Sequence, residues 1–120
     1  MKKYGIKILD CTLRDGGYVI NWLFGENNIK SVMENLNLAG IDYIECGFLK
    51  NCAENKDLTF FNTINFEEKI FKPEQKYTLM INCGEYDIKD IPENKNKNIK
   101  IRIAFKKHNQ NKAFELIKGI

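Results

Sequence analysis

Short apolar runs recur along the chain and alternate with polar segments. Four of them are rich in residues that favour β-structure and predict strands over residues 6–11, 41–48, 77–82 and 99–105. The last run is the clearest, because isoleucines at every second position alternate with Lys100 and Arg102.

Helical periodicity appears between the first two predicted strands. Apolar residues there fall at i, i+3, i+4 and i+7, on one face of a helix: Ile29, Val32, Met33 and Leu36. Asn27 or Asn28 can cap the start of this helix, and Gly40 stands where a C-terminal cap glycine belongs. Residues 64–71 predict a short second helix, and Asn109 can cap a last helix near the end of the chain.

Strands that alternate with helices predict an α/β fold with a parallel sheet and right-handed crossovers. Two architectures fit this order: a small doubly wound sheet, or a partial (β/α)8 TIM barrel made of about the first four βα units. A complete barrel needs about 250 residues. With 120 residues, the chain is close to half of one, and residues 1–120 form one domain.

Composition narrows the classes of function. The chain is 43% hydrophobic and 29% charged, and its formal net charge of +3 is spread over scattered lysines, so we expect no nucleic-acid surface. No apolar run approaches the ~18 residues of a membrane span, and no signal peptide is evident, so we expect a cytoplasmic protein with no membrane partner. The cysteines form no C-x-x-C pair and are expected to be reduced packing residues: Cys11, Cys46, Cys52 and Cys83.

Candidate chemistry gathers where the first predicted strand ends. Arg14 and Asp15 stand there, directly before Gly16 and Gly17. An aspartate can supply hard oxygen ligands to a divalent cation, and an arginine can hold a carboxylate or a developing oxyanion. Asp-Gly and Gly-Gly are also common turn dipeptides, so these four residues alone leave a purely structural turn open.

Several segments together resemble a known enzyme family. Residues 9–17 (Leu-Asp-Cys-Thr-Leu-Arg-Asp-Gly-Gly) resemble the first-strand signature of the metal-dependent aldolases typified by 4-hydroxy-2-oxovalerate aldolase. Residues 42–48 (Asp-Tyr-Ile-Glu-Cys-Gly-Phe) resemble the second strand of this family, which ends in Glu-x-Gly. Residues 82–86 and 101–105 are similar to the third and fourth strands. The wider superfamily includes hydroxymethylglutaryl-CoA lyase-like and pyruvate carboxyltransferase-like barrels.

The resemblance implies roles for individual residues. Asp15 would bind the divalent metal, Mn²⁺ or Mg²⁺, and Arg14 would contact the substrate carbonyl and the enolate. Glu45 would lie with Asp15 at the carboxyl ends of the strands and take part in catalysis. Tyr18 stands where many of these aldolases have an acid/base histidine. A tyrosine is a poorer base than a histidine near neutrality.

The chain departs from the family in its histidines. The family binds its metal through a late His-x-His pair, whereas the single histidine here, His108, has no histidine partner and is expected to be a solvated loop residue. The resemblance therefore implies the N-terminal half of an aldolase-type barrel, either a fragment of a longer protein or a naturally truncated product. As an isolated polypeptide it should show little or no turnover.

Three functions follow as hypotheses. The first is retro-aldol cleavage of a 4-hydroxy-2-oxo acid to pyruvate and an aldehyde, with a small-molecule 2-oxo acid as substrate. The second is an acyl-CoA-dependent Claisen condensation or a carboxyl transfer within the same superfamily. The third is a non-catalytic half-barrel that assembles with itself, as a homo-oligomer, or with the missing C-terminal half of the barrel, because open sheet edges favour pairing. A phosphate cradle at Gly16-Gly17 is disfavoured, because the full G-x-G-x-x-G spacing is absent.

Overall fold

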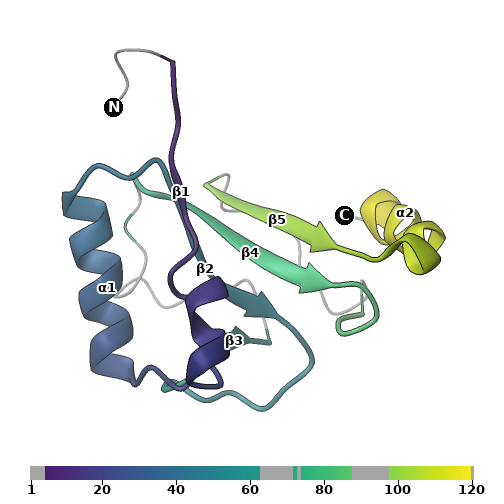
Figure 1. Cartoon of the computed structure of the whole chain (residues 1–120), viewed down its shortest axis with the longest axis horizontal. Coiled ribbons are helices and arrows are strands. Elements are labelled where there is room, and N and C mark those ends of the chain that lie inside the picture. The colour runs from purple at the N-terminus through teal and green to yellow at the C-terminus, as the bar shows by residue number, and fades with distance from the viewer. Residues whose placement is uncertain (1–4, 63–71, 73, 88–97, 120) are drawn as a thin grey trace.

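The computed structural model describes residues 5–62, 72, 74–87 and 98–119. Within them, five strands form one parallel sheet: β1 (Leu9–Asp10), β2 (Tyr43–Leu49), β3 (Phe60–Phe61), β4 (Lys76–Asn82) and β5 (Ile99–Ala104). The main order is β1-β2-β4-β5, and β3 pairs with β2 (Figure 1). The predicted α/β class and the parallel sheet are confirmed, while the predicted helix over 64–71 lies outside the described residues.

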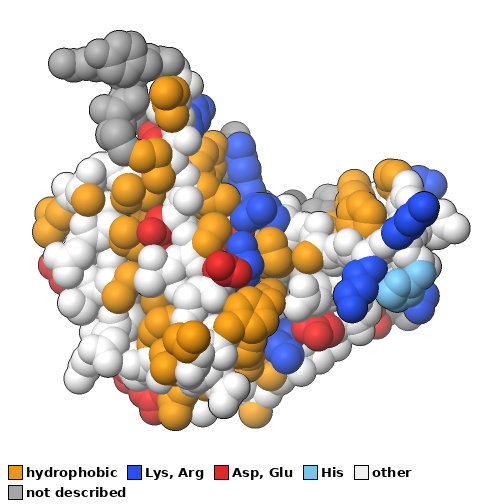
Figure 2. Space-filling view, viewed as in Figure 1, with side chains coloured by type: hydrophobic (Ala, Val, Ile, Leu, Met, Phe, Trp, Pro, Cys, Tyr) orange, Lys and Arg blue, Asp and Glu red, His pale blue; other side chains and the backbone are white. Residues whose placement is uncertain are grey.

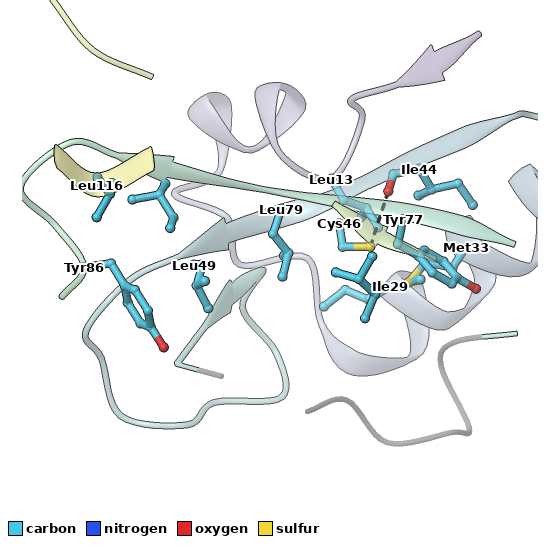
Figure 3. Close-up of a cluster of buried hydrophobic side chains, with 12 residues drawn as sticks. Leu13, Ile29, Met33, Ile44, Cys46, Leu49, Tyr77, Leu79, Tyr86 and Leu116 are labelled. Atoms are coloured by element: carbon cyan, nitrogen blue, oxygen red, sulfur yellow. Dashed lines mark hydrogen bonds between the residues drawn. The ribbon is translucent and has the colours of Figure 1, made fainter. Parts of the chain in front are cut away.

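In the described ranges, two α-helices accompany the sheet, α1 (Glu26–Leu38) and α2 (Gln110–Gly119), together with two 3₁₀ turns, η2 (Asp15–Val19) and η4 (Lys107–Asn109). Ile29, Met33 and Leu116 from the two helices join one core cluster with side chains of β2, β4 and β5. Figure 3 shows Ile29 and Met33 of α1 beside Cys46 and Tyr77 of the strands. Both helices therefore cover the same face of the sheet. Neither is long and apolar enough to cross a membrane.

The helix α1 ends as predicted but begins differently. Gly40 has φ +77°, its N–H donates to the carbonyl of Asn37, and the N–H of Ile41 donates to the carbonyl of Leu36. These bonds satisfy the last carbonyls of the helix in the manner of a Schellman motif. At the start, the predicted cap by Asn27 or Asn28 is wrong, because Asp57 accepts hydrogen bonds from the N–H groups of residues 25 and 26.

The first strand is shorter than the predicted 6–11. Its pairing with β2 is confined to Leu9 and Asp10, because the Asp10 carboxylate then accepts hydrogen bonds from the N–H and hydroxyl of Thr12. This side-chain turn diverts the backbone away from the sheet. The chain continues into η2, and β3 takes over the edge of β2 beyond the point where β1 ends. The predicted strands at 41–48, 77–82 and 99–105 match β2, β4 and β5 to within two residues.

A bulge in β2 interrupts the alternation of its side chains between the two faces. Glu45 pairs with Thr78 and Phe48 with Met80, so β2 holds one extra residue between these pairs. Gly47 lies in the bulge, and a Cβ atom there would stand 2.0 Å from the carbonyl oxygen of Thr59. Only glycine permits this approach, which brings β3 against the end of β2.

Candidate functional site

The candidate site is built around Glu45, whose side chain is fully buried in β2. Arg14 Nε donates to Glu45 Oε1 over 2.7 Å. Arg102 Nη1 donates to Glu45 Oε2 over 2.8 Å, and the Thr78 hydroxyl donates to the same oxygen over 2.7 Å. Cys11 Sγ lies 3.8 Å from Oε1 as a weaker donor. One carboxylate thus joins the turn after β1 to strands β2, β4 and β5.

Such a buried carboxylate is stable only because each of its oxygens receives hydrogen bonds from charged or polar donors. No buried side-chain nitrogen or oxygen in the described part of the chain lacks a hydrogen-bond partner. Because its two oxygens together accept from two arginines, a threonine and a thiol, Glu45 is suited to hold these groups in place.

Arg14 lies between two acidic groups. Its Nη1 donates to Asp15 Oδ1 over 3.0 Å while its Nε is held by Glu45. Burial by itself lowers the pKa of Arg14, but the hydrogen bond and the negative charge of Glu45 outweigh it, and the pKa is raised. Its side chain is 15% exposed, whereas that of Asp15 is 68% exposed. The guanidinium is thus a fixed cation, and the Asp15 carboxylate stands at the surface.

The turn that carries Arg14 is held by Trp22. The indole Nε1 donates to the carbonyl of Arg14 over 2.6 Å, and the backbone N–H of Trp22 donates to the carbonyl of Gly17. A Cβ atom on Gly17 would lie 2.0 Å from Trp22 Cδ1, so glycine is required for this contact. Asn21 and Trp22 both adopt positive φ, 51° and 59°, a conformation that costs free energy and is therefore maintained by these contacts.

The structure brings together three of the four predicted site residues. Arg14, Asp15 and Glu45 form a continuous hydrogen-bonded chain. Tyr18, the fourth, lies in η2 with its side chain exposed. Its ring contacts the ring of Trp22 edge-on, with 4.7 Å between the two ring centroids. Arg102 and Trp22 were not predicted as part of the site. The alternation along 99–105 does place Arg102 on the polar face of its strand, which was the available signal.

The histidine lies away from this chain of bonds, whereas one cysteine, Cys11, contacts Glu45. His108 lies in η4 and is exposed, as expected for a solvated residue. All four cysteines are free, and burial raises the pKa of the Cys46 thiol well above its ordinary value. A cavity of about 490 Å³ lies at the amino ends of β2 and β4, where Tyr43 and Lys76 contribute to its wall.

Metal ligands are sparse around Arg14. Among the described residues, no group of three or more His, Cys, Asp or Glu side chains is arranged to hold a metal ion. Asp15 is exposed, and its hydrogen bond from Arg14 involves Oδ1. Asp15 therefore fits as one oxygen ligand of a hard divalent cation, but the described residues do not supply a complete site.

Comparison with known proteins yields two short matches. A 40-residue segment, 33% of this chain, is 40% identical to oxaloacetate decarboxylase from Mycobacterium tuberculosis (strain ATCC 25618 / H37Rv) and covers 12% of that protein. A 45-residue segment, 38% of this chain, is 40% identical to 4-hydroxy-2-oxovalerate aldolase from Geobacillus genomosp. 3 and covers 13% of it. No family model matches the chain, and no solved structure gives a significant match. The similarity is thus confined to 33–38% of this chain and to 12–13% of the length of each of these two enzymes.

Proposed function

We propose that this chain carries part of the active site of a divalent-metal-dependent lyase that cleaves a carbon–carbon bond of a 2-oxo acid. The observation that carries the proposal is the Arg14–Asp15 pair, fixed on a glycine turn at the carboxyl end of β1 by the buried Glu45. Ligands of parallel α/β sheets bind at the carboxyl ends of the strands. The two short matches to lyases support the same reaction class.

The reaction proposed is retro-aldol cleavage of a 4-hydroxy-2-oxo acid. Removal of the proton from the 4-hydroxyl group breaks the bond between C3 and C4 and releases an aldehyde. The electron pair of that bond forms a C2–C3 double bond, and the π pair of the C2 carbonyl moves onto its oxygen to give an enolate. Protonation of C3 then gives pyruvate. Negative charge therefore develops on one oxygen, and the site must stabilise that oxygen.

Arg14 is the group we assign to this oxygen. Its Nε and one Nη1 hydrogen are directed to Glu45 and Asp15, which leaves the rest of its five N–H donors for the substrate. Because Glu45 holds the guanidinium before substrate binds, little reorganisation is needed as the charge develops. Glu45 is then a positioning residue.

Asp15 is the group we assign to the metal. A divalent cation held there would stabilise the negative charge that develops on the 2-oxo oxygen of the substrate. Tyr18 stays the proposed proton-transfer residue, on the resemblance alone. Its exposed hydroxyl would serve in a complete site only if the substrate reaches η2.

The test is calorimetric titration of the chain with Mn²⁺, with and without oxalate as a mimic of the enolate. We expect Mn²⁺ binding that tightens with oxalate and that weakens more than about tenfold in Asp15→Asn, since even outer-shell partners of metal ligands contribute 10–100-fold. Glu34→Gln is the matched control, because Glu34 is an exposed carboxylate on α1. Binding that is equal in Asp15→Asn and in the unchanged chain would remove Asp15 from the site.

A further inference from the structure

Arg102 is placed beside the candidate site by β5 and is not used in the scheme above. Its Nη1 binds one oxygen of the Glu45 carboxylate, and Arg14 binds the other. The two guanidinium groups are therefore separated by no more than one carboxylate and two hydrogen bonds. Their exposures differ: the side chain of Arg102 is 43% exposed, against 15% for Arg14.

Among the described residues, most of the donors of Arg102 are directed at no protein group. A guanidinium has five N–H donors in a fixed fork. In the part of the chain that the structure describes, the bond to Glu45 is the hydrogen bond that the Arg102 side chain makes. The free part of the fork can bind a carboxylate in two-point geometry.

Register places Arg102 on the ligand side of the network. Thr78 pairs with Lys100, and Met80 pairs with Arg102. Arg102 thus stands two residues closer to the carboxyl ends of the strands than Thr78, and its side chain reaches back to Glu45. Because ligands enter parallel sheets from that end, Arg102 lies on the approach to Arg14.

Basic side chains lie along this face of the sheet. Figure 2 shows a band of Lys and Arg side chains over the sheet. Four basic side chains lie on the face that carries Glu45 or at its edge: Arg14, Lys76, Lys100 and Arg102. Arg14 and Arg102 contact the acidic groups Glu45 and Asp15, whereas Lys76 and Lys100 stand toward the amino ends of their strands, where Asp42 and Glu74 line the same cavity as Lys76. A cation at Asp15 would add positive charge beside Arg14.

We propose that Arg102 binds a second anionic group of the substrate, so that the site takes a 2-oxo acid with a carboxylate at each end. The inference rests on the proposed function, which places the 2-oxo end of the substrate at Arg14. It specifies the substrate further, because Arg102 would make the site prefer dicarboxylic over monocarboxylic 2-oxo acids.

The test uses a stable pair of ligands that differ by one carboxylate, malate and lactate. Their affinities for the chain are measured by NMR titration. We expect malate to bind about tenfold more tightly than lactate, because one additional charge-assisted hydrogen-bonded pair increases affinity by about that factor. In Arg102→Gln the ratio of the two affinities should fall to near one. In Lys112→Gln, which removes one exposed charge from α2, the ratio should stay as in the unchanged chain.

A second measurement uses the unchanged chain and therefore does not depend on whether a variant folds. The Nε–Hε signal of Arg102 should shift on addition of malate and stay in place on addition of lactate. Equal shifts with both ligands, or a malate preference that survives Arg102→Gln, would overturn the inference. If malate and lactate bind equally while Mn²⁺ and oxalate bind through Asp15, the role proposed for Arg102 is wrong and the lyase proposal stands. If the malate preference depends on Arg102 but Mn²⁺ does not bind, the lyase proposal is the one that fails.

Discussion

The two faces of the sheet use the same strands for opposite purposes. On β5, isoleucines at 99, 101 and 103 turn to the helix-covered core, and Lys100 and Arg102 turn to the other face. On β4, Tyr77 and Leu79 are likewise separated by Thr78. Strand alternation thus builds a dry core and a charged surface from adjacent residues.

The difference teaches where this chain can place a functional group. The covered face gains free energy from apolar burial and contains no ion pair among its described core residues. The other face holds a buried carboxylate only because strands β4 and β5 and the turn after β1 supply its donors. A substitution on one face should therefore have a different measurable effect from a substitution on the other face.

Removal of Glu45 should have the largest effect. In Glu45→Ala the cations Arg14 and Arg102 lose their shared partner, and Thr78 loses its acceptor. We expect a loss of about 3 kcal/mol in the free energy of unfolding, at the low end for a broken buried ion pair because both arginines keep contact with water. Urea denaturation measures this. Glu34→Ala, an exposed glutamate, should change stability by less than about 0.5 kcal/mol. A loss below about 1 kcal/mol for Glu45→Ala would mean that the network does not stabilise the fold.

Replacement of Gly17 should have an intermediate effect, confined to the turn that carries Arg14. A Cβ at Gly17 collides with Trp22, whereas a Cβ at Gly16 would meet Thr12 Cγ2 at an ordinary contact distance of 3.8 Å. Gly17→Ala should therefore cost about 1–3 kcal/mol through forced displacement of the ring. Trp22 is the one tryptophan of the chain, so its fluorescence should shift to longer wavelength in Gly17→Ala and stay unchanged in Gly16→Ala. The same spectrum for both variants would contradict the packing of Trp22 on this turn.

The smallest effect is a difference in titration between two tyrosines on opposite faces. The hydrogen bond from Lys100, above all, lowers the pKa of Tyr43 below its ordinary 10.0, with the charges of Lys100 and Lys76 adding to it. Burial raises the pKa of Tyr77 above the same value, and the hydrogen bond from the Lys72 N–H opposes it only in part. In an NMR titration of the ring carbons, Tyr43 should ionise at lower pH than Tyr77.

The two shifts act on stability with opposite signs. Tyr77 keeps its proton more firmly in the folded chain, so its contribution is lost as pH rises through the alkaline range. Tyr43 releases its proton more readily when folded, so its contribution appears as pH rises. Lys100→Gln should raise the titration midpoint of Tyr43 and leave that of Tyr77 in place. Equal midpoints in the unchanged chain would contradict the contrast between the two faces.

Local pattern was enough to predict much of the fold. Helix period and a terminal glycine located α1 and its end, and two-residue alternation located β5. The failures lie where distant residues decide. Asp57 caps α1 from 31 residues away. The shortened β1 is the exception, because there the cause is a local turn between Asp10 and Thr12. The pairing of β3 with β2 depends on the close approach at Gly47, which composition does not reveal.

The candidate site divides in the same way. The sequence by itself determined that an arginine, an aspartate and two glycines follow the first strand, because those residue types are adjacent in the chain. Only the tertiary structure decided that Arg14 and Arg102, 88 residues apart in the numbering, share one buried carboxylate. Strand order and register determine which side chains stand side by side, and neither is encoded in any single segment. The reaction that we propose depends on both, since the turn supplies the groups and the sheet holds them in place.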